Sequence, residues 1–209
     1  MPSPRFDQSA CDQLAQAVRE IETQTDAEIV IVVRARSGNY RHADYLWGFI
    51  LSFACLLFML FAPFDFHHYW VAIDVLVFFV IGSYISSRSN TLRRLVTTKE
   101  ERAEAVRQGA AAMFYEAGIA NTEAEMGVLI YLSLLERRLE LIADRGVLKA
   151  APPLEWNERV YELHRAGRVP RLDTLMKAIR DLGTLLAACL PPTGENPNEL
   201  PDMPRFDLK

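Results

Sequence analysis

The feature that most constrains this chain is a run of 43 residues, 45–87, in which only Asp65 and Asp74 are charged. Residues 45–62 form an uncharged stretch of 18 residues, and residues 69–86 form a second of the same length that contains Asp74. An α-helix rises ~1.5 Å per residue, so each stretch spans ~27 Å, close to the ~30 Å hydrocarbon core of a bilayer. The sequence therefore predicts two helices that cross a membrane.

The six residues between the stretches, 63–68, make a connection short enough to predict a helical hairpin. Aromatic residues gather at the ends of both stretches, where amphipathic rings favour the headgroup layer: Tyr45, Trp47, Phe64, Phe66, Tyr69, Trp70 and Tyr84. The alternative is a pair of core helices in a soluble protein. The length of the stretches, their aromatic flanks and their lack of Lys and Arg argue against it.

Basic residues predict the orientation of the hairpin. Those that precede it are Arg34, Arg36 and Arg41, those that follow it are Arg88, Arg93, Arg94 and Lys99, and its loop has none. Because cytoplasmic flanks are enriched in Lys and Arg, we expect a two-pass protein of the plasma (inner) membrane with both termini in the cytoplasm.

The residues outside the hairpin predict an α/β domain. Helical spacing of apolar residues predicts helices over about 9–24, from 99 to Gly118, after Pro152-Pro153 and from Asp173, with capping boxes at Ser9 and Thr98. Apolar runs predict buried strands at 28–33, 128–135 and 139–142, the last two joined by a polar turn at Glu136-Arg137.

This order of elements predicts one layered α/β domain, formed by residues 1–43 and 88–190, into which the hairpin of residues 44–87 is inserted. Residues 191–209 contain five prolines, and we expect an irregular tail there. The first two strands should be parallel. If the first runs toward the membrane, Glu136, Arg137 and Arg138 lie beside Arg34 and Arg36 near the headgroups, and the carboxyl end of the sheet, where such folds usually place ligands, faces the bilayer.

Composition and motifs exclude several functional classes. The net charge of −4 is mild and argues against a nucleic-acid partner. The three cysteines, Cys11, Cys55 and Cys189, are far apart, so we expect free thiols. Glycine-rich phosphate loops, nucleophile elbows and His-Glu-x-x-His zinc motifs are all missing from the sequence. We therefore assign no catalytic residue.

Three sets of residues are candidate sites. Glu123, Glu125 and Asp144 offer oxygen ligands for Ca²⁺ or another divalent cation, although solvated loop carboxylates are the commoner case. Arg34, Arg36, Arg137, Arg138 and Arg145 are candidates for binding lipid phosphates or an acidic partner surface, the alternative being topology determinants. Asp74 is the ionisable group within a predicted span and is a candidate for a relay or ion pathway.

Several strings together resemble the TPM-domain family, and within it a bacterial membrane-protein branch whose domain is interrupted by two transmembrane helices. They are residues 22–33, Gly127 to Arg138, Ala143-Asp-Arg-Gly146, Trp156 and Asn198-Glu-Leu-Pro-Asp202. The resemblance implies an α/β/α sandwich with a Rossmann-like layer order. Relatives include a thylakoid protein linked to photosystem II repair with acid phosphatase activity, calcium-binding bacterial domains and a membrane protein that modulates a receptor. Many relatives carry Asp-Gly or Asn-Gly ahead of the Gly-Val-Leu strand, where this chain reads Glu125-Met126-Gly127, a departure that weakens a calcium or phosphatase assignment.

Three functions follow as hypotheses. The first is a non-enzymatic binding, assembly or quality-control module at the cytoplasmic membrane face, with membrane lipid and a membrane protein as partners. The second is a metal-dependent acid phosphatase. The third is an oligomeric transport component that works through Asp74.

The predicted topology has a direct test by cysteine labelling in intact cells, after the three native cysteines are replaced. We expect a cysteine introduced at Phe66 to react with a membrane-impermeant reagent added outside, because that residue lies in the loop. A cysteine at Asn121 should react only after the membrane is permeabilised. The opposite pattern would invert the orientation.

Overall fold

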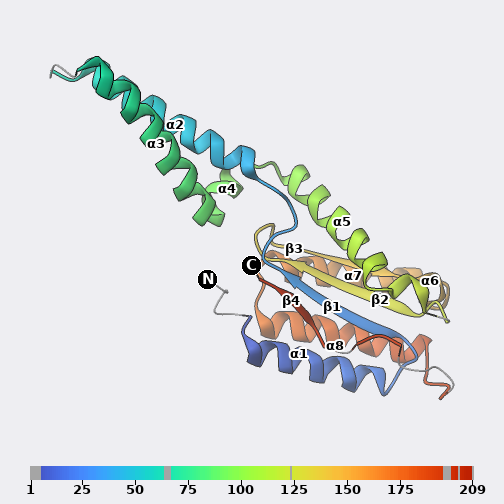
Figure 1. The fold of residues 1–209 in the computed structure, drawn as a ribbon. Coiled ribbons are helices and arrows are strands. Elements are labelled where there is room, and N and C mark those ends of the chain that lie inside the picture. Colours follow the sequence, from blue (N-terminus) through green and yellow to red (C-terminus); the bar gives the residue numbers. More distant parts are fainter. Residues whose placement is uncertain (1–5, 64–66, 123, 195–198, 202, 209) are drawn as a thin grey trace. The chain divides into compact units, whose positions relative to one another are not determined.

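A computed structural model describes residues 6–63, 67–122, 124–194, 199–201 and 203–208. The chain forms two compact units, one of residues 1–38 and 103–209 and the other of residues 39–102. The first contains the sheet and the second contains the long apolar helices (Figure 1).

The first unit is built on a four-stranded sheet with the strand order β3-β2-β1-β4. β1 (Glu28–Arg34) pairs in parallel with β2 (Gly127–Ser133), from Glu28 opposite Gly127 to Arg34 opposite Ser133. β3 (Arg138–Ala143) runs antiparallel to β2, and β4 (Arg205–Asp207) runs parallel to β1. The three predicted strands and the parallel pairing of the first two are confirmed.

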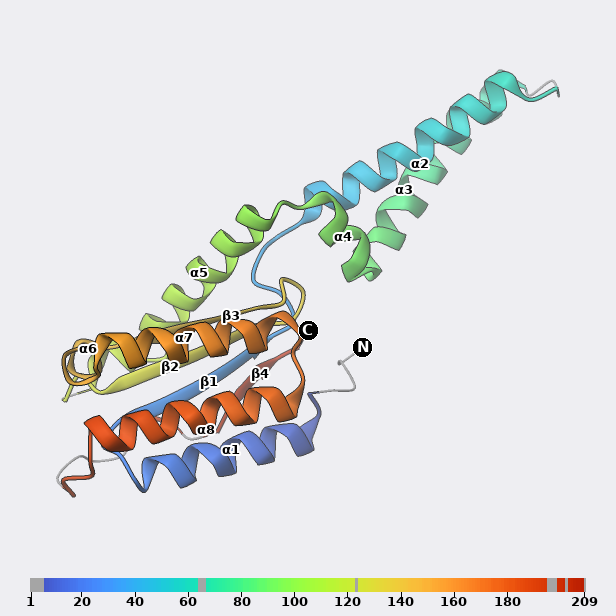
Figure 2. The same ribbon diagram turned by 180° about the vertical axis from the view of Figure 1, so that it is seen from behind.

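Helices pack on both faces of this sheet (Figures 1 and 2). One face carries α1 (Gln8–Glu22), α7 (Pro153–Arg168) and α8 (Leu172–Cys189), whose apolar side chains form one core with the strands. The other carries α5 (Lys99–Glu116) and the short 3₁₀ helix η1 (Ile119–Asn121), which form a second core. The mixed α/β fold is therefore confirmed, and Trp156 packs against the first core.

The ends of α5 follow the predicted chemistry. Thr98 accepts a hydrogen bond at Oγ1 from the backbone N–H of Glu101 (3.1 Å), as the capping box requires. Gly118 follows the helix with φ of +75°, a left-handed conformation in which glycine avoids the steric cost of a Cβ.

The start of α1 and the tail differ from the predictions. Asp7 caps α1 by accepting from the N–H of Ala10 (3.0 Å), whereas Ser9 lies inside the helix and accepts from Gln13. The tail is not irregular throughout, because Arg205–Asp207 forms β4 on the edge of β1 that β2 leaves open. α6 (Arg145–Ala150), capped by Asp144, was also not predicted.

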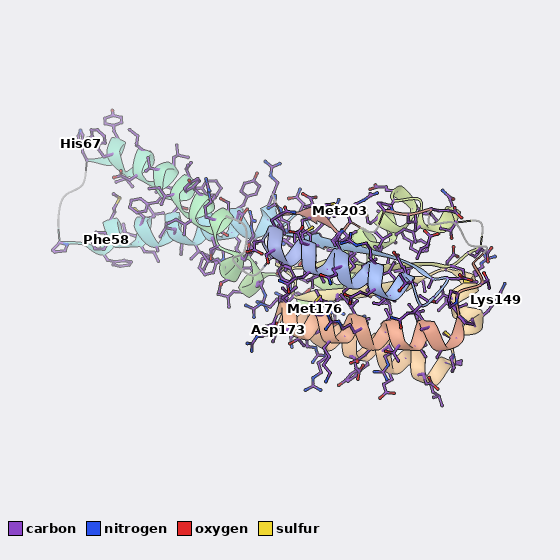
Figure 3. The ribbon with its side chains drawn as sticks, turned by 90° about the horizontal axis from the view of Figure 1, so that it is seen from below. Phe58, His67, Lys149, Asp173, Met176 and Met203 are labelled. Carbon is purple, nitrogen blue, oxygen red and sulfur yellow. The ribbon has the colours of Figure 1, made fainter. Side chains whose placement is uncertain are left out.

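The second unit contains α2 (Arg41–Phe61), α3 (His68–Arg88) and α4 (Asn90–Val96), the last of which was not predicted. α2 and α3 are long and apolar enough to cross a membrane, and only 17% and 11% of their most apolar windows are buried. Figure 3 shows Phe58 and His67 near the loop end of this pair. Helices of a soluble core would be mostly buried, so this exposure is evidence against that alternative.

Two glycines set the contact between α2 and α3. A Cβ added to Gly48 would lie 2.2 Å from Ser83 Oγ and 2.7 Å from the carbonyl oxygen of Phe79. A Cβ added to Gly82 would lie 2.8 Å from the carbonyl oxygen of Trp47 and 2.9 Å from Gly48 Cα. The backbones approach at small residues, which is how apolar helices pack where water does not drive their association.

A buried ion pair holds the three helices of this unit together. Arg93 of α4 donates from Nε to Asp44 Oδ1 (2.9 Å) and from Nη2 to Asp44 Oδ2 (2.8 Å). Ser86 of α3 donates to the same Asp44 of α2 (2.8 Å), and both charged side chains are at most 10% exposed. This planar two-bond pairing satisfies both charges where water is excluded.

We expect Asp44→Ala to destabilise this unit by about 3–5 kcal/mol, because it leaves the Arg93 guanidinium buried without its carboxylate. Thermal unfolding in detergent measures the loss. The double variant Asp44→Ala/Arg93→Ala should lose less stability than the sum of the losses in the two single variants, because it leaves no unpaired buried charge.

The matched control is Glu101→Ala, which breaks the half-exposed pair between Glu101 and His42 (3.2 Å) in the same unit. That change should cost less than about 1 kcal/mol. Equal effects of the two single changes would show that the Asp44 pair contributes no more than a surface contact.

Candidate functional site

The segment that leaves β1, residues 35–38, is held from two sides. On one side Leu134 N–H donates to the carbonyl oxygen of Arg34 and Leu135 N–H to that of Ala35, both at 2.9 Å. On the other side Ala35 N–H donates to the carbonyl oxygen of Asp207 (2.8 Å). The segment is therefore fixed between the β2–β3 turn and β4.

Glu136 turns inward from this turn and is only 4% exposed. Its Oε1 accepts from two consecutive backbone N–H groups, those of Ser37 (2.9 Å) and Gly38 (3.0 Å), and its Oε2 accepts from Ser133 Oγ. The sequence predicted the turn at Glu136-Arg137 but did not predict that Glu136 is buried. The carboxylate is buried because the amides of residues 37 and 38 need an acceptor there.

The hydroxyl groups beside Glu136 complete what we call the linker cluster, which comprises Ser37, Gly38, Tyr131, Ser133 and Glu136. Ser37 Oγ donates to Ser133 Oγ (2.9 Å) and lies 2.9 Å from Tyr131 Oη. Tyr131 and Ser133 are fully buried. α5 closes over them at Gly109, where an added Cβ would lie 2.7 Å from Tyr131 Oη.

Sequence reasoning missed the linker cluster. The available signal was Ser133 at the end of an otherwise apolar strand, two residues after Tyr131 and hence on the same face of the sheet. Its partner Ser37, and Gly38, which donates to Glu136, are about a hundred positions away in the sequence, so no local pattern links them.

Four of the five candidate arginines lie at the carboxyl end of β1 and β2. Arg34 ends β1 opposite Ser133, which in turn lies opposite Arg138. Arg36 and Arg137 are exposed in the adjoining segment and turn. Arg34 is paired with Asp207 (3.4 Å). Arg145 begins α6 at the opposite end of the sheet, so the five do not form one surface.

The predicted metal ligands are only partly brought together. The turn containing Asp144 meets the loop containing Glu125, since Gly146 N–H donates to the carbonyl oxygen of Glu125 (3.0 Å). Glu123 lies outside the described residues. Within the residues that are described, no group of three acidic, histidine or cysteine side chains is arranged to hold a metal ion.

Asp74 is half-buried in α3, and the described residues offer it no hydrogen bond. The carboxylate that is built into a network in this unit is Asp44, which the sequence analysis did not single out.

Nucleophilic chemistry has little support at these positions. Ser133 is fully buried and its hydroxyl group is engaged by Glu136, so it is not an accessible nucleophile while Glu136 is in place. All three cysteines are free thiols. Burial, with a smaller contribution from Asp12, raises the pKa of Cys11, and burial likewise raises the pKa of Cys189. Both therefore stay protonated and unreactive near neutral pH.

Comparisons with known proteins give information on the fold only. No family model matches the chain, and no curated protein sequence matches it. The NMR structure of the BA42 protein from the psychrophilic bacterium Bizionia argentinensis is similar, with a TM-score of 0.58 and 14% sequence identity over 96% of this chain and 94% of that one. At that identity the likeness concerns the arrangement of the backbone, and it carries no assignment of activity.

The close approach of α5 to Tyr131 predicts a reversed effect of a helix substitution. Gly→Ala in a helix ordinarily stabilises by about 1 kcal/mol. Gly109→Ala should instead destabilise by roughly 1–3 kcal/mol, because the new methyl group meets the buried Tyr131 hydroxyl. Chemical denaturation measures the change.

The second variant Gly109→Ala/Tyr131→Phe removes the obstructing oxygen and should recover part of the loss. Ala111→Gly, at an exposed position of the same helix, provides the intrinsic propensity for comparison. A stabilising Gly109→Ala would mean that α5 does not pack closely over the linker cluster.

Proposed function

We propose that this chain is a membrane-anchored protein in which a TPM-like α/β/α sandwich acts as a non-enzymatic binding or assembly module at the cytoplasmic face of the plasma (inner) membrane. The observation that carries the proposal is the exposed apolar surface of α2 and α3, two helices long enough to cross a bilayer. Water-exposed surfaces of this size and composition are rare in soluble proteins.

The way the hairpin is joined to the sheet supports an anchoring role. β1 ends at Arg34 and α2 begins at Arg41, so only six residues connect them. Within that connection, the N–H groups of Ser37 and Gly38 donate to Glu136 of the sheet unit. The hairpin is thus inserted between two paired strands, and the chain joins it to the sheet unit at both of its ends.

The arginines at the carboxyl end of β1 and β2 are the proposed contact with an acidic partner surface. Arg137 is exposed, and Arg138 follows it at the first position of β3. Guanidinium groups pair with carboxylates and phosphates through two hydrogen bonds, which gives such a surface both affinity and orientation.

A metal-dependent phosphatase is the second candidate, and one observation favours it. Asp144 Oδ2 is buried with no hydrogen-bond partner among the described residues. A cation is one way to satisfy such an oxygen. The described ligands do not reach the number that Ca²⁺ requires, so we place this function second.

The proposed function is tested by crosslinking the full-length protein in native membranes and identifying what is captured with it. Charge reversal at Arg137→Glu/Arg138→Glu should reduce capture of its specific partners roughly 10–100-fold, because two attractive contacts become repulsive. Quantitative mass spectrometry measures the ratio.

Arg145→Glu is the matched control, since it reverses an exposed arginine at the opposite end of the sheet. It should leave capture unchanged. Unchanged capture by the double variant would refute the proposed surface. Phosphate release by the purified protein with Ca²⁺, Mg²⁺ or Mn²⁺, and its loss in Asp144→Asn, would favour the phosphatase instead.

A further inference from the structure

We propose that the backbone amides of Ser37 and Gly38, together with the Ser133 hydroxyl, form a binding site for the oxygens of a phosphate group, and that the Glu136 carboxylate occupies this site in the ligand-free chain. Glu136 then acts as a built-in competitor. The inference concerns the sheet unit alone and does not rest on the membrane anchor.

The donors have the geometry of an anion site. Two consecutive N–H groups converge on one oxygen of Glu136, at 2.9 and 3.0 Å, and the Ser133 hydroxyl donates to the other. Successive backbone amides that point at one centre form a concavity that attracts anions. The Ser37 hydroxyl supports this arrangement by donating to Ser133 Oγ and contacting Tyr131 Oη.

The position within the fold is the one that ligands use in related architectures. Arg34 and Ser133 are the last residues of the parallel strands β1 and β2, and the proposed donors lie at or directly beyond this edge. Open α/β sheets bind ligands at the carboxyl ends of their strands. The linker cluster therefore stands where a ligand would be expected, and the chain's own carboxylate fills it.

Nearby charge favours phosphate over a simple carboxylate ligand. Arg36 and Arg137 are exposed on the two segments that supply the donors and Glu136. Arginine pairs with phosphate oxygens through two hydrogen bonds, and phosphate has more oxygens to share among arginines and amides than a carboxylate has.

The turn that carries Glu136 is suited to release it. Arg137 adopts a φ of +52°, a left-handed conformation that costs energy for a residue with a Cβ. Moving the turn away would relieve this strain. Because the same turn holds the linker through Leu134 and Leu135, binding of a phosphate group would alter how residues 35–38 are restrained.

The test follows the backbone amide resonances of Ser37 and Gly38 in full-length protein labelled with ¹⁵N-serine and ¹⁵N-glycine, during titration with inorganic phosphate. Glu136→Gln keeps the shape of the competitor but removes its charge, and Glu136→Ala removes the competitor. We expect apparent phosphate affinity to rise at least tenfold in Gln and further in Ala, relative to the native chain. Ser133→Ala added to Glu136→Gln should reduce the gain.

A parallel titration with a short-chain phosphatidic acid distinguishes the two sources of the phosphate group. Tighter binding of inorganic phosphate indicates a soluble ligand, and tighter binding of phosphatidic acid indicates a lipid headgroup. The Gln variant retains an acceptor for the amides, so it tests the proposal even if Glu136→Ala fails to fold. The proposal would be overturned if the resonances of Ser37 and Gly38 responded to neither probe in the Gln variant. Glu136 would then have only a structural role, as the hydrogen-bond acceptor for these amides.

Discussion

The parallel pairing of β1 and β2 is the contact on which the rest of the structure depends. These central strands are joined by residues 35–126, which include the whole second unit. The entropy of closing a loop grows only with the logarithm of its length. A connection that is roughly threefold longer because of residues 39–102 therefore costs about 1 kcal/mol more to close. A large apolar insertion is tolerated because the cost depends so weakly on length, provided that both ends are fixed to the sheet.

Both units meet the same requirement, which is to pair every buried polar group. In the sheet unit Glu136 accepts hydrogen bonds from the amides of the connecting segment. In the helical unit Asp44 accepts hydrogen bonds from Arg93 and Ser86. The second pairing also refines the orientation argument. Arg93 is neutralised by Asp44, so its charge does not add to the excess that favours a cytoplasmic flank, which Arg88, Arg94 and Lys99 still carry.

Helices and strands that depend on the pattern of nearby residues in the sequence were predicted well. Leu175, Ile179, Leu182 and Leu186 are spaced for one helical face and are all buried in α8, and the β-branched run after Glu28 forms β1. The linker cluster and the Asp44 pair were missed, because each joins segments that only the tertiary fold brings together. A glutamate in a turn and an aspartate at a helix start look like solvated residues until their partners are known.

A repeated tetrapeptide shows most directly why local sequence did not suffice. Pro-Arg-Phe-Asp occurs at residues 4–7 and again at 204–207. In the first copy Asp7 caps α1, whereas in the second Phe206 and Asp207 belong to β4. The rings of Phe6 and Phe206 nevertheless meet edge to face, with centroids 6.2 Å apart. The first copy precedes an amphipathic run that can continue as a helix, and the second reaches the open edge of β1. The Phe-Asp pair shared by both copies thus takes the structure that its surroundings allow, and part of the tail that composition predicted to be irregular forms the fourth strand.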